Sequence, residues 1–263
     1  MKLLTLFSIS MLFFSCSEDS NAQDLNPSLD DNLVWEENFN GSSLNESDWN
    51  IELGNGCPNN CGWGNNERQI YTENNHKVKD GHLIITAIKN EDTYTSTRIT
   101  TKDKHEFQYG TIEARAKLPI GQGIWPAFWM LGANINEVGW PKCGEIDILE
   151  YVGKEPETVY TTIHTTDTHG ANASSQKTTF KNIEDGFHIF KAEWTPNSIK
   201  FFVDEQLVYT YSPENKTEDN WPFNKPQFII VNMAVGGNFG GPEVDDTIFP
   251  LQYIVDYIKV YKN

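Results

Sequence analysis

The sequence has little positive charge, no convincing helical periodicity and few cysteines. Its 20 Lys and Arg residues are outnumbered by 37 Asp and Glu residues, which gives a net charge of −17. A negative surplus of this size argues against binding to nucleic acid, to anionic membranes and to sulfated polysaccharides, all of which attract basic proteins. The charge therefore favours a neutral ligand.

The missing helical period also limits the fold. From His82 onward, short apolar or alternating runs follow one another, and turn signals such as Asp80-Gly81 and Leu118-Pro119 separate them. We find no internal repeat. The pattern predicts one all-β domain of the β-sandwich class, whose antiparallel sheets can leave one face open to solvent. The predicted strands include 83–88, 97–101, 111–118, 124–131, 159–164, 190–194, 199–203, 206–211 and 253–261.

The apolar run at the N-terminus is too short to span a membrane as a helix. Residues 1–15 predict a signal peptide, and the Ser15-Cys16 junction resembles a lipoprotein cleavage site. This resemblance implies lipidation of Cys16, export and anchoring at the outer membrane, at the cell surface. The alternative is an ordinary secretory signal that is cleaved elsewhere. The polar residues 16–31 predict a flexible tether, so the domain itself is expected to span 32–263.

Only four cysteines are present. Cys57 and Cys61 lie close in sequence, and a disulfide between them is possible after export. A metal site is the weaker interpretation, because only Cys143 remains as a further thiolate near the motifs. We expect Cys143 to be buried and unpaired beside the strand described next.

That strand is the stretch from Gly144 to Tyr151, which carries three carboxylates among apolar residues. Side chains alternate along a strand, so Glu145 and Asp147 share a face. Strict alternation would bury Glu150 and expose Leu149, which is unfavourable. A β-bulge at Ile148–Leu149 would return Glu150 to the acidic face.

Three adjacent carboxyl groups are tolerated if one keeps its proton. Two carboxyls with separated pKa values can act as nucleophile and general acid in a retaining glycosidase, at about 5–5.5 Å from each other. The Cα atoms of Glu145 and Glu150 would lie roughly 13 Å apart, so both side chains must lean inward. A solvated acidic edge or a cation site is the alternative.

Tryptophans surround this strand in the sequence. Trp125 and Trp129 fall on one face of the preceding strand, and Trp140 lies in the loop before Glu145. Flat aromatic faces of this kind stack on sugar rings, although Trp129 could instead belong to the core.

Three motifs together resemble glycoside hydrolase family 16. GEIDILE at 144–150 resembles its active-site signature in the bulged form of the laminarinase and agarase side, and GWGNNE at 62–67 and NMAVGGN at 232–238 resemble laminarinase segments. The resemblance extends over about 33–263. It implies a jelly roll of two curved antiparallel sheets with an open concave cleft.

The resemblance also implies roles for individual residues. Glu145 would be the nucleophile, Glu150 the general acid and base, and Asp147 the group between them that tunes their protonation. His164 would lie beside the acids, although a lone histidine is more often a satisfied core residue. The expected substrate-binding residues are Asn65, Glu67, Arg98, Trp125, Trp129, Trp140, His164 and Asn232. For Asn65 and Glu67, a self-capped turn is the alternative.

The implied reaction is internal cleavage of a β-1,3-glucan such as laminarin, with mixed-linkage β-1,3-1,4-glucan as a possible second substrate. The alternatives are an agarase-type β-galactanase and a non-catalytic glycan-binding surface lipoprotein. We expect a monomer that needs no cofactor for catalysis. The family resemblance further implies a structural Ca²⁺ near Asn38, Gly81 and Asp256, because Ca²⁺ prefers oxygen ligands.

Overall fold

The computed structural model describes residues 32–263. The predicted signal peptide, Cys16 and the tether 16–31 lie outside the described residues. Within the described range, no helix has the length and apolar character needed to cross a membrane.

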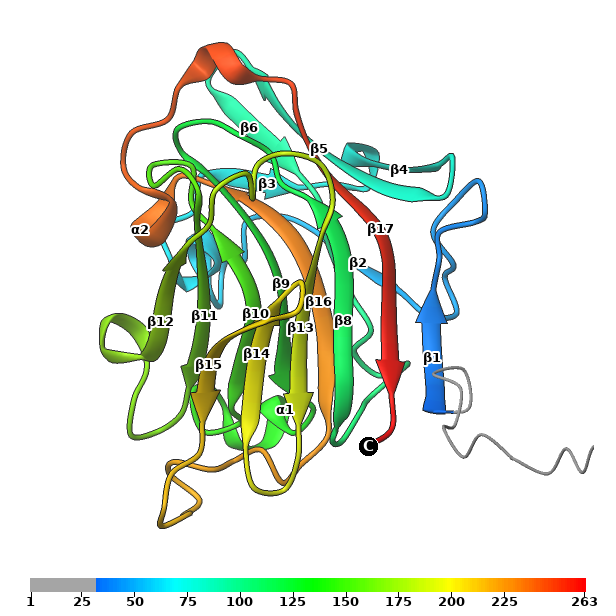
Figure 1. The fold of residues 1–263 in the computed structure, drawn as a ribbon. Helices are drawn as coiled ribbons and strands as arrows, with labels where there is room; N and C mark the ends of the chain where they lie inside the picture. The colour runs from blue at the N-terminus through cyan, green and yellow to red at the C-terminus, as the bar shows by residue number, and fades with distance from the viewer. Residues whose placement is uncertain (1–31) are drawn as a thin grey trace, which may run out of the picture.

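Two stacked β-sheets form the body of the molecule, and Figure 1 shows that their strands are curved. The larger sheet has ten strands. Its main path runs through β15 (Gln206–Tyr211), β14 (Ile199–Val203), β13 (His188–Trp194), β8 (Gly110–Lys117), β17 (Leu251–Tyr261), β5 (His82–Asn90), β6 (Thr93–Ser96) and β3 (Gln69–Tyr71). In addition, β1 (Leu33–Glu37) pairs with β17, and β4 (His76–Lys79) pairs with β5.

The smaller sheet has seven strands and is wholly antiparallel. Its order is β12 (Ser174–Thr179), β11 (Thr158–His164), β10 (Glu145–Tyr151), β9 (Ile124–Gly132), β16 (Gln227–Val235), β7 (Arg98–Thr100) and β2 (Asn50–Glu52). The helical segments of the described chain are single turns: η2 (Cys61–Gly64), η3 (Glu73–Asn75), α1 (Ile135–Val138), η4 (Gly170–Asn172), α2 (Gly237–Gly240) and η5 (Asp246–Ile248).

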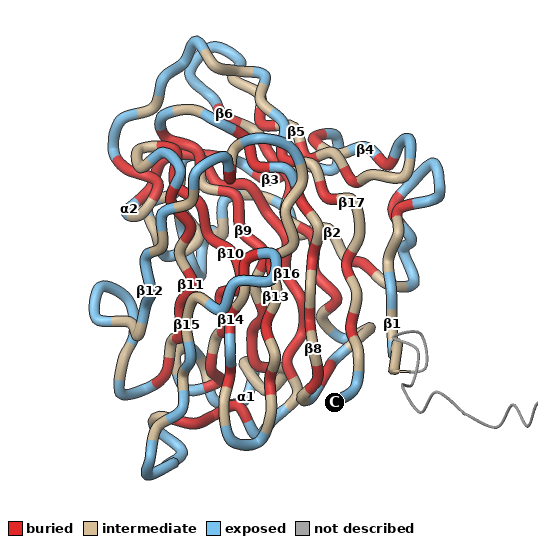
Figure 2. The backbone as a smooth tube through the Cα atoms, viewed as in Figure 1, coloured by how far each residue is buried: buried red, intermediate tan, exposed pale blue. Residues whose placement is uncertain are grey.

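The hydrophobic core fills the space between the two sheets. Strand β8 shows why: Ile112, Ala114 and Ala116 are buried, whereas the residues between them are more exposed. Such alternation places one face of each strand in the core. Figure 2 shows that buried residues are concentrated in the strands and that exposed residues are concentrated in the loops.

The predicted β-sandwich is confirmed, with one departure from purely antiparallel sheets. The three-residue strand β3 pairs with β6 in parallel. Just before β3, Glu67 forms an isolated bridge with Gly236, which follows β16. This bridge places the end of the 62–67 motif beside the seven-stranded sheet.

Candidate active site

The predicted bulge in β10 is present. The pairing of β10 with β11 shifts between Asp147 and Glu150, and its pairing with β9 shifts between Asp147 and Leu149. Ile148 and Leu149 both belong to the core between the sheets. The three acids therefore occupy the opposite face of the seven-stranded sheet, which we call the acid face.

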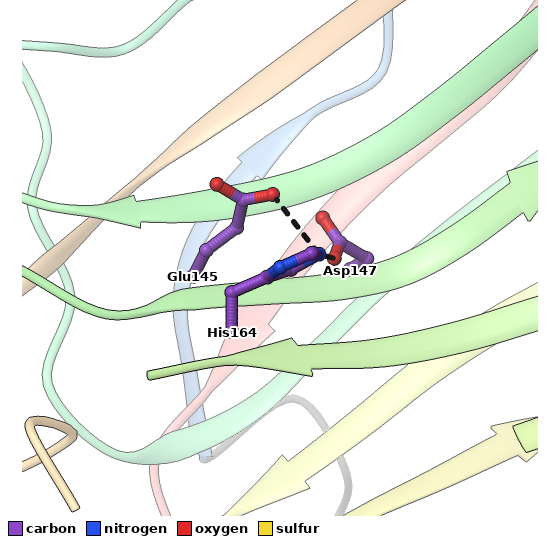
Figure 3. Close-up of side chains that lie close together, drawn as sticks. All are labelled: Glu145, Asp147 and His164. Carbon is purple, nitrogen blue, oxygen red and sulfur yellow. Dashed lines mark ion pairs between the residues drawn. The ribbon is translucent and has the colours of Figure 1, made fainter. Parts of the chain in front are cut away.

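His164, at the end of β11, lies directly beside two of the acids. Its Nε2 is 3.2 Å from Oδ2 of Asp147 and 3.6 Å from Oε1 of Glu145 (Figure 3). The backbone N–H of Gly170 donates to Nδ1 of His164 over 3.1 Å. Because Nδ1 accepts a hydrogen bond, the ring proton is assigned to Nε2, where it faces the two carboxyl groups.

The same three side chains offer ligand atoms within 4.8 Å of one another, which is close enough to hold a metal ion. A metal at Nε2 needs the lone pair of that nitrogen, and the other nitrogen then normally donates a hydrogen bond. In His164 the other nitrogen is an acceptor from Gly170 instead. The arrangement therefore favours a hydrogen-bond cluster over the cation-site alternative.

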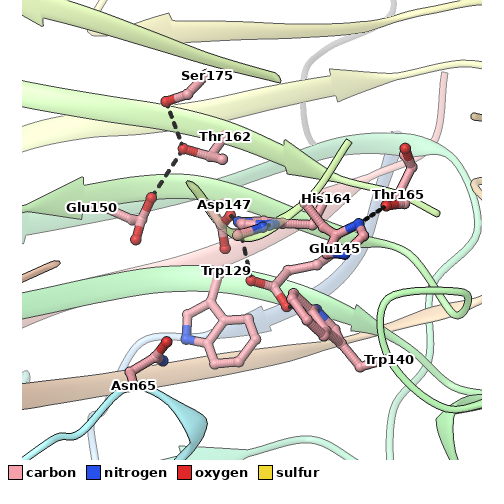
Figure 4. A network of polar contacts seen from close by, with 12 residues as sticks. Asn65, Trp129, Trp140, Glu145, Asp147, Glu150, Thr162, His164, Thr165 and Ser175 are labelled. Atoms are coloured by element: carbon pink, nitrogen blue, oxygen red, sulfur yellow. Dashed lines mark hydrogen bonds and ion pairs between the residues drawn. The ribbon is translucent and has the colours of Figure 1, made fainter. Parts of the chain in front are cut away.

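Glu150 is almost completely buried and receives two hydrogen bonds. The indole N–H of Trp125 donates to Oε1 over 3.2 Å, and the hydroxyl of Thr162 donates to Oε2 over 3.0 Å. Thr162 in turn contacts the hydroxyl of Ser175 on β12 at 2.9 Å (Figure 4). Burial, and then the nearby charge of Asp147, raises the pKa of Glu150 to about 8. Glu150 thus keeps a proton at neutral pH, as a general acid requires.

Asp147 lies between the two glutamates and is 3% exposed, so burial raises the pKa of its carboxyl group well above the ordinary value. The neighbouring charge of Glu145 adds to this shift. A carboxyl group that keeps its proton lets three acids stand together on one face. The raised pKa of Glu150 fits its predicted role as the general acid.

Trp140 is close to Glu145. Its indole N–H donates to Oε2 of Glu145 over 2.7 Å. The centre of the Trp140 ring lies 5.8 Å from that of the His164 ring and 5.5 Å from that of the His169 ring. The residue is 47% exposed, so the ring is available to a ligand.

Trp129 is half-buried on the acid face rather than in the main core, and it pairs across the strands with Asp147. Its indole N–H donates to Oδ1 of Asn232 over 2.7 Å. The guanidinium of Arg98 lies 4.9 Å from the centre of the Trp129 ring and 4.5 Å from that of Trp63. Arg98 also forms an ion pair with Glu52, so this donor is already held by the protein.

Asn65 and Glu67 come together in the 62–67 motif, where Nδ2 of Asn65 donates to Oε1 of Glu67 over 3.3 Å. Glu67 is engaged further by Gln69 and Tyr71. The structure thus brings all eight predicted substrate-binding residues to the acid face or its border, and their contacts with sugar stay predictions.

The three predicted calcium positions lie on the ten-stranded sheet and its loops. The Asp256 carboxylate is ion-paired with Arg115, and its other oxygen is 3.7 Å from Nε2 of His82. Asp256 has no partner in the pairing register of β17, because the register shifts between its two neighbours. An arginine-bound carboxylate is a poor ligand for Ca²⁺, so the calcium prediction depends on backbone oxygens.

The cysteine predictions are confirmed. Cys57 and Cys61 form a disulfide, and Cys143 is free and buried. Sequence reasoning missed Thr162, which donates to Glu150, and Ser175, which contacts Thr162. It also missed Gln69 and Tyr71, which donate to Glu67. Only the strand alternation of 159–164 signalled that Thr162 would face the acids.

Comparison with known proteins agrees with this fold. The family model described as "Glycosyl hydrolases family 16" matches residues 64–257, and the chain belongs to this family.

Individual relatives resemble the chain over nearly its whole length. A laminarinase structure from Flavobacterium sp. UMI-01 is 63% identical, with a TM-score of 0.86, and the match covers 88% of this chain and 100% of that one. A beta-glucanase from Rhodothermus marinus is 37% identical over 98% of this chain and 94% of its own length. A glucan endo-1,3-beta-glucosidase from Cryptopygus antarcticus is 38% identical over 86% of this chain and 90% of its own length.

Proposed function

We propose that the chain is a retaining endo-β-1,3-glucanase that hydrolyses laminarin internally. The observation that carries the proposal is the state of Glu150, a buried carboxyl group whose pKa is raised to about 8 and which shares its sheet face with Glu145. A protonated acid and a second carboxylate beside aromatic side chains are what double displacement at a sugar requires.

In the first step, Glu145 attacks the anomeric carbon and Glu150 transfers its proton to the leaving glycosidic oxygen. The N–H of Trp140 donates to one oxygen of Glu145, and Nε2 of His164 lies 3.6 Å from the other. Trp125 and Thr162 hold Glu150 at both oxygens. No cofactor takes part.

In the second step, Glu150 has lost its proton and acts as the general base. It accepts a proton from water while the water oxygen attacks the glycosyl–Glu145 ester. Cleavage of this ester restores the Glu145 carboxylate and returns the proton to Glu150. The product keeps its anomeric configuration because two inversions have occurred.

The substrate proposal is supported by the charge of −17, which suits a neutral glucan. Names of similar proteins, such as endo-1,3-beta-glucosidase and laminarinase, support the β-1,3 linkage. Mixed-linkage β-1,3-1,4-glucan is the second expected substrate.

The test is reducing-sugar release from laminarin, lichenan, agarose and carrageenan, with Glu145→Gln as an isosteric control. We expect release from laminarin in the wild type and a loss of at least about a thousandfold in the control. Release from agarose alone would support the galactanase alternative. Binding of laminarin without release would support a glycan-binding protein.

The proposal extends to anchoring and assembly. We expect lipidation at Cys16, a place at the outer-membrane surface and a monomeric catalytic domain. Mass spectrometry of the N-terminal peptide, with Cys16→Ala as the control, tests the lipid. Light scattering of the purified domain tests the oligomeric state.

A structural Ca²⁺ near Asn38, Gly81 and Asp256 is also part of the proposal. Its role would be to stabilise the fold. The melting temperature in EDTA compared with Ca²⁺ tests it, and an unchanged value would contradict it.

A further inference from the structure

The motif at 62–67 contains one carboxylate that the reaction above does not use. Both oxygens of Glu67 accept hydrogen bonds from protein side chains. Nδ2 of Asn65 donates to Oε1 over 3.3 Å, and Nε2 of Gln69 donates to Oε2 over 2.6 Å. The hydroxyl of Tyr71 also donates to Oε2, over 3.3 Å. Three protein donors therefore hold the carboxylate of Glu67 in place.

Tyr71 continues this network toward the acid face. Its oxygen accepts a hydrogen bond from Nδ2 of Asn232 over 3.1 Å, and Oδ1 of Asn232 accepts from Nε1 of Trp129 over 2.7 Å. Every link donates in the same direction, from indole to amide to phenol to carboxylate. Hydrogen bonds aligned in this way polarise one another, and the negative charge of Glu67 ends the chain.

The network ends at a side chain beside the catalytic acids. Trp129 pairs with Asp147 across the strands, and Arg98 lies over the Trp129 ring at 4.9 Å. The edge of the indole is thus held by Asn232, while Arg98 holds its face. With edge and face both fixed, the ring has one orientation.

We propose that Glu67 is a positioning residue that orients Trp129, the sugar platform, through Tyr71 and Asn232, and thereby sets the affinity for substrate. Cleavage itself stays with the acids of β10. The inference rests on the proposed function, because Trp129 is a platform only if the acid face binds a sugar chain.

The chemistry of the network requires a carboxylate at position 67. An amide there would place its –NH₂ group against Gln69 and Tyr71 in one orientation, and against the Asn65 amide, which would have to turn over, in the other. Gln69 is not free to reverse, because its own Oε1 accepts from the backbone N–H of Val235 over 2.8 Å. Glu67→Gln therefore disrupts the network without changing its size.

The test uses two variants that break the network at different links, Tyr71→Phe and Glu67→Gln, with Tyr253→Phe as the matched control. Tyr253 is fully buried, and its hydroxyl has no hydrogen-bond partner among the described residues. On laminari-oligosaccharides we expect KM to rise about three- to tenfold in both variants, as the loss of one hydrogen bond predicts. We expect kcat to stay within about twofold.

A double-mutant cycle shows whether the effect passes through Trp129. In a Trp129→Phe background, Tyr71→Phe should add little to KM, because the platform that it orients is already changed. A full additional increase in that background would overturn the proposal. An unchanged KM in both Tyr71→Phe and Glu67→Gln, or a fall confined to kcat, would overturn it as well.

A second readout needs no substrate. Subtracting the spectrum of Trp129→Phe from that of the wild type isolates the Trp129 emission, and the same subtraction is made in each variant background. We expect Tyr71→Phe to shift this emission and Tyr253→Phe to leave it in place. If the wild type cleaves none of the glucans but the shift is present, the positioning network stands and the proposed function fails. An unchanged emission would overturn the positioning role.

Discussion

The indole N–H of Trp140 lies 2.7 Å from Oε2 of Glu145, the carboxylate that attacks the sugar in the proposed reaction. One exposed aromatic side chain therefore contacts the proposed nucleophile directly, and its ring is open to solvent. The two roles can be separated by substitution.

Trp140→Phe keeps an aromatic ring and removes the donor. We expect kcat to fall about tenfold, because the hydrogen bond orients Glu145 for attack. The same bond stabilises the Glu145 carboxylate that is released when the glycosyl ester is cleaved. Steady-state kinetics on laminarin measures the effect. A rise in KM with kcat unchanged would instead show that Trp140 acts only as a platform.

The pH profile depends on the hydroxyl of Thr162, which donates to Glu150. This bond favours the ionised carboxylate and so lowers its pKa, against the larger effect of burial. Glu150 must be protonated in the first step, so kcat/KM should fall as the pH rises through about 8. In Thr162→Val the pKa rises further, and the alkaline limb should move to higher pH.

A control for this profile is available on the same strand. Thr161 is buried, and its hydroxyl has no hydrogen-bond partner among residues 32–263. Thr161→Val should therefore leave the alkaline limb in place. An equal shift in both variants would assign the effect to general packing of β11.

The raised pKa of Glu150 also predicts a pH-dependent stability. A carboxyl group whose pKa is higher in the folded state costs stability as the pH rises above its unfolded pKa, and the cost is complete above about 8. Glu150→Gln removes that cost. We expect its melting temperature to match the wild type near pH 4 and to exceed it increasingly toward pH 9.

Circular dichroism melting at several pH values measures this difference. Substitution of Gln for the exposed Glu214 serves as the control and should show a constant offset. A difference for Glu150→Gln that shrinks with rising pH would contradict the assignment of a buried, protonated acid.

The disulfide between Cys57 and Cys61 closes a short loop, with a sequence separation of 4. The loop-entropy relation gives about 2 kcal/mol for a closure of this size. We expect Cys57→Ser/Cys61→Ser to melt several degrees below the wild type. Dithiothreitol should lower the melting temperature of the wild type alone, and an equal response in both proteins would exclude this bond as the cause.

The fold was predictable where hydrophobic alternation is strong. The bulge in β10 followed from Leu149 and Glu150, which a regular strand would place on the wrong faces. Strand β12 was not predicted, because Ser174–Thr179 contains no apolar residue that could signal a buried face. The parallel pairing of β3 was missed as well, since three residues are too few to show a period.

The sequence predicted which residues gather at the site better than it predicted the hydrogen bonds between them. Glu145, Asp147 and Glu150 lie on one strand, so their common face follows from the sequence. The register pairs Thr162 with Asp147, and the bulge that follows brings Glu150 within 3.0 Å of the Thr162 hydroxyl. The sequence did not reveal this contact between two strands. Glu67 belonged to a recognised motif, yet its partners Tyr71 and Gln69 became visible only in the folded chain.

The hydrogen bond from Gly170 makes His164 a natural NMR probe of the active site. The ring nitrogens of this histidine are inequivalent, because one accepts from the backbone and the other carries the proton beside Asp147. In protein labelled with ¹⁵N-histidine, the two nitrogens should resonate far apart. Entry of a sugar chain would change the surroundings of the protonated nitrogen first, so occupancy of the site can be followed without a dye or a modified substrate.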